Sequence, residues 1–146
     1  MQRVREANVS VDGAVTSRIG AGLLVFAGIA VDDTADDREW LARKLPGLRI
    51  FDDERGVMNR SIIDVAGSML VVSQFTLHAS TCKGNRPSWS RAAPPESAKP
   101  QFDALVEALA ARLSKPVQTG VFGADMQVSL VNDGPVTLWL DSRSRE

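Results

Sequence analysis

Residues 23–31 read LLVFAGIAV, and this stretch decides the class of fold. It contains no polar or charged side chain, so it lacks the apolar–polar alternation of a half-buried strand. Such a run is typical of a strand that is buried on both faces. Its nine residues are too few to span a membrane, which takes about 18 or more apolar residues. The sequence therefore predicts a central strand here, covered on both sides by other parts of the chain.

The segments around this run predict further strands and two helices. Asp12-Gly13 has the composition of a tight hairpin turn between two short strands. Thr34 is a good helix N-cap with an acid, Asp37, three residues later, and Pro46-Gly47 ends the helix that it opens. Apolar residues at helical spacing predict a second helix over about residues 97–113. Further strands are expected at residues 48–51, 69–77, 117–119, 126–132 and 136–140.

These elements predict a single α/β domain over residues 1–146, dominated by sheet, with two main helices that cover one sheet. The length suits one ordinary domain with its own core. The single cysteine, Cys82, leaves no partner for an internal disulfide, and residues 1–6 contain no apolar leader. We therefore expect a cytoplasmic protein.

The charges are unevenly placed, although the net charge is only −1. Four aspartates lie within residues 32–37, whereas the middle of the chain carries Lys83, Arg86, Arg91 and Lys99. An ordinary solvated surface explains such runs, and a local patch that binds a phosphate backbone is the alternative. The sequence leaves both interpretations open.

The residues that common catalytic centres need are largely missing. His78 is the only histidine, and no Gly-x-Ser-x-Gly elbow surrounds Ser73, which disfavours a Ser–His triad. Cys82 has only that one imidazole as a possible base. The chain has no glycine loop of the phosphate-binding or dinucleotide-binding kind, and a zinc site would need several carboxylates. No metal and no cofactor are predicted.

Two short segments remain as candidates for chemistry. Residues 73–77, Ser-Gln-Phe-Thr-Leu, place polar side chains at the end of an apolar strand. Gly134-Pro135 interrupts what otherwise reads as one strand from Met126 to Leu140, because proline has no N–H to give to a ladder. The glycine lets another molecule approach the backbone closely. The step is therefore either a simple turn or a pair of carbonyl groups held in a fixed geometry.

Ser73–Leu77, taken together with Asn132-Asp133-Gly134-Pro135-Val136-Thr137, resembles the bacterial- and eukaryotic-type D-aminoacyl-tRNA deacylase family. The likeness covers nearly the whole chain, through residues 2–4, 19–25, 49–51, 58–59, 86–88, 118–120 and 123–129. It implies a three-layer β/β/α sandwich of mixed, largely antiparallel sheets. It also implies a homodimeric hydrolase that cleaves the ester between a D-amino acid and the terminal adenosine of tRNA.

The resemblance also implies roles for the residues that match the family motifs. Backbone N–H groups of a catalytic pocket stabilise the oxyanion, and the pocket is formed by Ser73, Gln74, Phe75 and Thr76. Gly134 and Pro135, joined by a cis peptide, form a chiral gate that reaches across the dimer and collides with L side chains. The gate is supported by Arg3, Asn132 and Thr137. Phe122 and Met126 are expected to contact the terminal adenosine.

Several alternatives stay open within this family likeness. Either the ribose 2′-hydroxyl of the substrate or Thr76 activates the attack on the ester. Glycyl-tRNA mischarged on tRNA-Ala is expected as a further substrate, because glycine has no side chain to collide with the gate. One rival is a related deacylase with a trans Gly-Pro step that acts on small L-aminoacyl-tRNA. Another is a non-catalytic RNA-binding module of the same fold.

Overall fold

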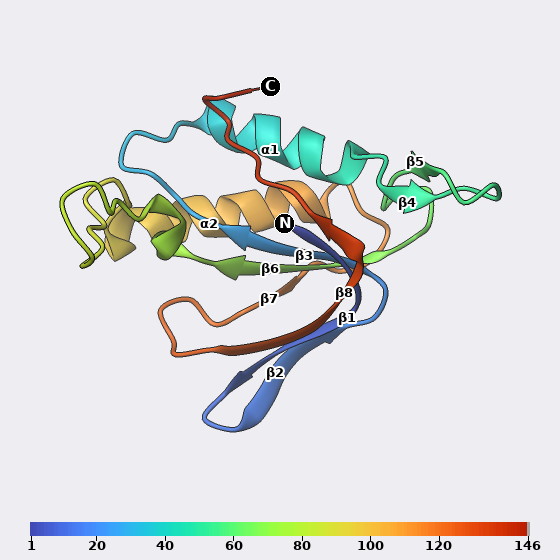
Figure 1. The fold of residues 1–146 in the computed structure, drawn as a ribbon, viewed down its shortest axis with the longest axis horizontal. Helices are drawn as coiled ribbons and strands as arrows, with labels where there is room; N and C mark the ends of the chain where they lie inside the picture. The colour runs from blue at the N-terminus through green and yellow to red at the C-terminus, as the bar shows by residue number, and fades with distance from the viewer. Residues whose placement is uncertain (146) are drawn as a thin grey trace.

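A computed structural model describes residues 1–145 as a strongly bent sheet with two helices packed on one side (Figure 1). The main sheet has the strand order β2-β1-β3-β6-β7, and β8 pairs with the other edge of β1. Its bounds are β1 Gln2–Val11, β2 Ala14–Ile19, β3 Gly22–Ala27, β6 Ser68–Ser73, β7 Gln118–Thr119 and β8 Gln127–Thr137. A separate small hairpin joins β4, Phe51–Asp52, to β5, Met58–Arg60. The helices are α1, Ala35–Gly47, and α2, Pro95–Ala110.

Strand β1 organises the bend, because it pairs with three other strands. Residues Gln2–Val4 pair with β3, and residues Ala7–Val11 pair with β2. Along its other edge β1 pairs with β8, and these three pairings are antiparallel. β3 and β6, and β6 and β7, are parallel. The sheet therefore folds over itself, and the mixed, largely antiparallel pairing that the sequence predicts is confirmed.

The stretch at residues 23–31 does place side chains on both faces of the sheet. Leu23 and Val25 belong to the core against the helices, together with Leu105 of α2. Leu24 points to the opposite face, into a second core with Val9 of β1. All of these side chains are buried. Two apolar layers thus hold three structural layers together, which are the helices, the β3-β6-β7 part of the sheet, and the β1-β2-β8 part.

The strand predicted over residues 23–31 ends earlier than expected. β3 stops at Ala27, and Gly28 lies against the turn that follows β6. A Cβ on Gly28 would lie 3.0 Å from Nε2 of His78 and 3.1 Å from the Gln74 carbonyl oxygen. This close approach of another segment takes the place of a continued strand, and the extension to residue 31 was wrong.

Other element bounds also differ from the prediction. The strand at residues 48–51 reduces to Phe51–Asp52 in the small hairpin. The strand at residues 69–77 ends at Ser73, and Phe75–His78 forms a short 3-10 helix, η1. The second helix begins at Pro95, whose fixed φ suits the first turn, and ends at Ala110. The two strands expected at 126–132 and 136–140 form one strand, β8.

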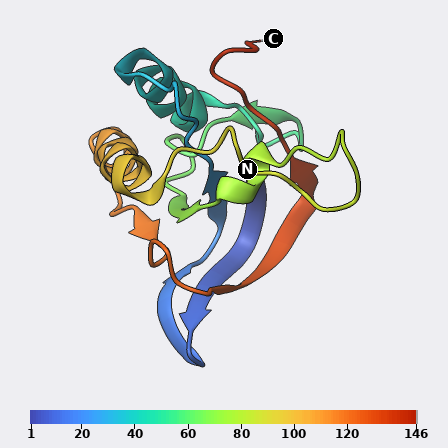
Figure 2. The same ribbon diagram turned by 90° about the vertical axis from the view of Figure 1, so that its left-hand side faces the viewer.

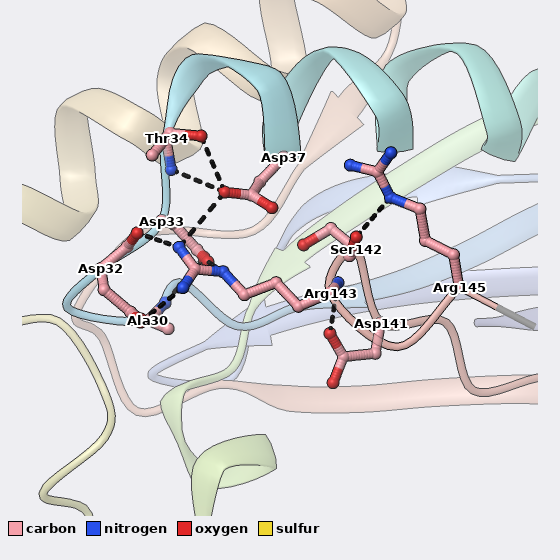
Figure 3. Close-up of polar contacts among 9 residues, drawn as sticks. All are labelled: Ala30, Asp32, Asp33, Thr34, Asp37, Asp141, Ser142, Arg143 and Arg145. Atoms are coloured by element: carbon pink, nitrogen blue, oxygen red, sulfur yellow. Dashed lines mark hydrogen bonds and ion pairs between the residues drawn. The ribbon is translucent and has the colours of Figure 1, made fainter.

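The capping box predicted at the start of α1 is present. The carboxylate of Asp37 accepts hydrogen bonds from the backbone N–H and the hydroxyl of Thr34, at 2.9 and 2.8 Å. The Thr34 N–H is the largest cause that lowers the pKa of Asp37, to about 2. In Figure 3 the guanidinium of Arg143, from the C-terminal segment, lies among Asp32, Asp33 and Asp37. The ion pairs of Arg143 attach the C-terminal segment to the start of α1, where the capping box lies.

We expect Asp37→Ala to lower the free energy of unfolding at pH 7 by about 1 kcal/mol, because it removes the acceptor of the box. The pKa of Asp37 is lowered by folding, so its stabilisation is present above its ordinary value of 3.8. It is lost as the pH falls toward about 2. Urea titrations of both chains between pH 7 and pH 2 measure this. Asp36→Ala, in the same turn but exposed, is the control. A difference that stays constant with pH would contradict the assignment.

Within residues 1–145 the structure contains no helix of the length and apolar character that a membrane crossing requires.

Candidate functional site

The end of β6 and the 3-10 helix η1 hold the first predicted set of site residues. Ser73 is the last residue of the strand, and the Gln74 N–H donates to the Ala27 carbonyl at 2.8 Å. Phe75 and Thr76 are the first residues of η1, so their N–H groups have no helical partner. Neither N–H donates to an acceptor within residues 1–145. The chain therefore presents two adjacent free donors, and they come from a helical turn rather than from the strand end that the sequence suggested.

A cavity of about 570 Å³ opens beside this turn. Ser73, Gln74 and Phe75 line it, but Thr76 does not; the Gln74 side-chain amide instead donates to the Thr76 hydroxyl. Phe122 and Met126, from the segment before β8, line it as well. The structure thus brings the first predicted set together with the two residues expected to contact adenosine.

The walls of this cavity are largely aromatic and aliphatic. The ring of Trp89 meets that of Phe75 edge to face, with 5.3 Å between centroids. Phe122 packs against Phe102 of α2, with centroids 5.9 Å apart. Such walls fit a flat, aromatic ligand that stacks on side-chain rings. Trp89 was not predicted as a site residue, and neither were further lining residues such as Ala93, Ala98 and Asp125.

The second predicted set forms a bulge in β8. Between the pairs Val4↔Asn132 and Gln2↔Thr137, β1 advances two residues and β8 advances five. The extra residues contain the Gly134-Pro135 peptide, which is cis, and both residues are exposed. The strand resumes its pairing after the bulge, so the step is an interruption inside one strand rather than a turn between two.

Asn132 braces this bulge from inside. Its side-chain oxygen accepts a hydrogen bond from the Val136 N–H at 2.9 Å, and its side-chain nitrogen donates to the Thr137 hydroxyl at 2.9 Å. Glycine is needed at position 134, where φ is +131°. A Cβ there would lie 2.8 Å from a methyl carbon of Val136. The two residues at the ends of the bulge therefore fix the backbone between them.

Arg3 lies under the same bulge. Its side chain is only 9% exposed, and its Nε donates to the Asp133 carbonyl at 3.0 Å. Its Nη1 donates to the Ile50 carbonyl at 2.6 Å and lies 3.4 Å from the Asp52 carboxylate. Its Nη2 would be 3.1 Å from a Cβ on Gly134. A planar guanidinium with several donors is suited to holding two carbonyls at once.

The two sets do not meet within one chain. Neither Gly134 nor Pro135 lines the cavity beside η1. A second cavity, of about 690 Å³, lies between the helices, β3 and the C-terminal segment; it is lined by Thr137 and His78 among others, but not by the Gly-Pro step. The step therefore points outward from the domain.

Residues 1–145 contain no group of three or more His, Cys, Asp or Glu side chains close enough to hold a metal ion. Nε2 of His78 is buried and has no hydrogen-bond partner within the same residues. Burial raises the pKa of Asp33, which faces the second cavity. Neither group lines the cavity beside η1. The polar side chains that line the cavity beside η1 are those of Ser73, Gln74 and Asp125.

The family model and the relatives that match this chain belong to the same family. A family model described as D-Tyr-tRNA(Tyr) deacylase matches residues 1–141. The D-aminoacyl-tRNA deacylase of Chromobacterium violaceum is 62% identical over 146 residues, which cover 100% of this chain and 97% of that protein. That of Chlorobaculum tepidum is 61% identical over 142 residues, or 97% of this chain and 95% of that protein.

Two solved structures share the fold. One, described as c-Myc DNA Unwinding Element Binding Protein, has a TM-score of 0.89 and 41% identity, covering 94% of this chain and 93% of that one. The other is described as a probable eukaryotic D-amino acid tRNA deacylase. Its TM-score is 0.75 at 17% identity, with 92% of each chain covered, so it supports the fold alone.

Proposed function

Because this chain belongs to the D-Tyr-tRNA(Tyr) deacylase family and is thus a D-aminoacyl-tRNA hydrolase, we propose that Gly134-Pro135 is its chiral gate. The observation that carries this proposal is the exposed bulge of β8, braced by Asn132 and backed by the buried guanidinium of Arg3. A rigid backbone at this place rejects an L side chain by collision. A D side chain leaves the α-carbon in the opposite direction and does not collide with the gate.

The gate acts in the site of a second copy of the chain. This part of the proposal is supported by the outward position of Gly134 and Pro135, which do not line the cavity beside η1. In a two-fold symmetric dimer, each chain offers the same patch to the other. Each site would then combine one chain's cavity with the partner chain's gate.

The cavity beside η1 holds the terminal adenosine of the tRNA acceptor end. Phe122 and Met126 supply apolar contacts to the base, and the Phe75–Trp89 pair closes one wall. The ester carbonyl then lies near the turn, where the N–H groups of Phe75 and Thr76 are free. Thr137 supports the gate through its bond with Asn132.

Hydrolysis follows from these donors. Water adds to the ester carbonyl carbon, and the negative charge that develops on its oxygen is stabilised by the two N–H groups, each worth roughly 3–4 kcal/mol. The ester C–O bond then breaks, and the leaving ribose oxygen takes up the proton that the attacking water has lost, which releases the free D-amino acid and the ribose hydroxyl. The ribose 2′-hydroxyl, rather than Thr76, activates the water in this proposal, because the Thr76 hydroxyl already accepts a hydrogen bond from the Gln74 side-chain amide.

We expect the protein to release D-tyrosine from D-tyrosyl-tRNA roughly a hundredfold or more faster than L-tyrosine from L-tyrosyl-tRNA. Glycyl-tRNA mischarged on tRNA-Ala should be cleaved as well, because glycine presents no side chain to the gate. Release of labelled amino acid at matched enzyme concentrations measures all three rates.

The outcomes of this assay separate the parts of the proposal. Equal rates on the D and L substrates would refute the gate while leaving a hydrolase. Resistance of glycyl-tRNA would mean that rejection uses more than a collision with a side chain. Failure to cleave any of the three would refute the hydrolase itself.

A further inference from the structure

We infer that the loop at residues 79–94, called here the basic loop, binds the phosphates of the tRNA strand that leads into the cavity. The inference rests on the proposed function, in that the substrate is a tRNA whose terminal adenosine lies beside η1. Residues 78–95 contain Lys83, Arg86 and Arg91 and no aspartate or glutamate. In a chain whose net charge is −1, this is a marked local excess of positive charge.

The three cations of the basic loop are free for a ligand. All three residues are exposed. None of them takes part in an ion pair within residues 1–145, although other surface cations such as Arg112 and Arg143 do. Charges without a protein partner are the ones that can neutralise phosphates without first breaking a contact.

The loop has a defined shape that presents these charges. Ser80 and Ser88 exchange two backbone hydrogen bonds of 2.9 Å each, which close the loop at its neck. Lys83 and Arg86 lie on the tip beyond that neck, around a turn at Gly84 with φ of +134°. Arg91 lies on the returning segment of the loop, which is attached to the segment after β3 by the Val31 N–H bond to the Arg91 carbonyl, at 3.1 Å. Figure 2 shows the yellow-green loop projecting from the domain.

The same loop forms part of the cavity wall. Trp89 and Ala92 line the cavity, and the Trp89 ring contacts Phe75 at the start of η1. A nucleotide chain that ends in the cavity and leaves it along this wall brings its last phosphodiesters next to the basic loop, which carries Lys83, Arg86 and Arg91; Arg91 also lines the second cavity. The basic loop would bind the strand through charge and would not distinguish one tRNA sequence from another.

The test is the salt dependence of tRNA binding by a triple variant, Lys83→Gln, Arg86→Gln and Arg91→Gln. Uncharged tRNA-Tyr is titrated by fluorescence anisotropy at several salt concentrations. Loss of three single-strand phosphate contacts should reduce the slope of log Kd against log salt by about 2. The ratio of the variant's Kd to the parent's Kd should then be about 16-fold smaller at about 200 mM salt than at about 50 mM salt.

Two matched variants serve as controls. Arg18→Gln, Arg43→Gln and Lys44→Gln remove three exposed cations from β2 and α1 that also lack an ion pair, and should leave the slope unchanged. The exchange Lys83→Arg, Arg86→Lys and Arg91→Lys keeps the charges and should retain the parent slope. Hydrolysis of D-tyrosyl-adenosine, which has no phosphate, should be unaffected by the triple Gln variant.

The inference is overturned if the triple Gln variant keeps the parent slope, or if the control triple lowers it equally. It is also overturned if hydrolysis of D-tyrosyl-adenosine falls as much as tRNA binding does, since the loop would then only shape the cavity. A parent chain that binds tRNA through the loop but does not deacylate it would refute the proposed function and leave this inference standing.

Discussion

Gly134→Ala is expected to lower kcat/KM on D-tyrosyl-tRNA by about a hundredfold or more, because a displacement of about 1 Å at a positioned group has that effect. The backbone at this residue has φ of +131°, which L side chains rarely adopt. The added methyl group would lie 2.8 Å from Cγ2 of Val136 and 3.1 Å from Nη2 of Arg3. Either the bulge or the guanidinium must move, and both define the proposed gate. Steady-state deacylation measures the loss.

The control for this variant is Gly20→Ala, which meets no atom within 4 Å and has no positive φ. It should behave like the parent chain in activity and in thermal stability. Gly134→Ala should cost about 1–3 kcal/mol of stability, the usual cost of a residue held in a disfavoured backbone region. Parent-like activity in Gly134→Ala would show that the bulge takes no part in selecting or positioning the substrate.

Mixing chains tests whether the gate acts across a dimer. Ala92→Trp fills the cavity beside η1 and should inactivate it, while leaving that chain's Gly134 intact. If gates act in trans, a random mixture of this chain with Gly134→Ala should recover about a quarter of the parent activity. Half of the dimers would then pair one intact cavity with one intact gate. If the gate acts within its own chain, the mixture should recover none.

Much of the fold follows from local patterns in the sequence. The run at residues 23–31 has apolar side chains at successive positions, so both faces of its strand had to be covered, as Leu23 and Leu24 are. The capping box of Thr34 and Asp37 and the Asp12-Gly13 turn are equally local. Elements of this kind are decided by neighbours in the sequence, and they were predicted correctly.

The errors arise where distant segments decide the structure. Nothing in residues 28–31 reveals that Gly28 will lie against His78 and Gln74. The end of β6 at Ser73 likewise coincides with the end of its partner strand β3 at Ala27, which is distant in the sequence. Proline at 135 was expected to separate two strands, yet β8 continues because the bulge absorbs the residues that cannot pair.

The candidate site was predictable in its motifs but not in its walls. Trp89 and Asp125 come from loops whose sequence has no periodicity, so no local pattern marks them as cavity walls. The partners of Arg3 lie 47 and 130 residues away along the chain. No local pattern could identify them, although the charge at position 3 was noticed through the family likeness.

Arg3→Met is expected to lower the free energy of unfolding by about 3–5 kcal/mol, because it removes two hydrogen bonds from a buried charged group, each worth about 1.5–3 kcal/mol. The substitution leaves the carbonyls of two half-buried residues, Asp133 and Ile50, without their donors. Deacylation should fall as well, because the bulge loses the group beneath it. Urea unfolding, followed by deacylation under conditions where the variant is folded, measures both effects.

Arg5 provides a matched control, because it contacts the same residue from the outside. Its Nε lies 3.0 Å from the Asp133 carboxylate, but its side chain is 75% exposed, against 9% for Arg3. Arg5→Met should therefore cost at most about 1 kcal/mol and leave deacylation unchanged. Arg3→Lys keeps the charge without the planar fork, so it should recover part of the stability but less of the activity. Equal effects of Arg3→Met and Arg5→Met would mean that charge near Asp133, rather than the buried fork, supports the bulge.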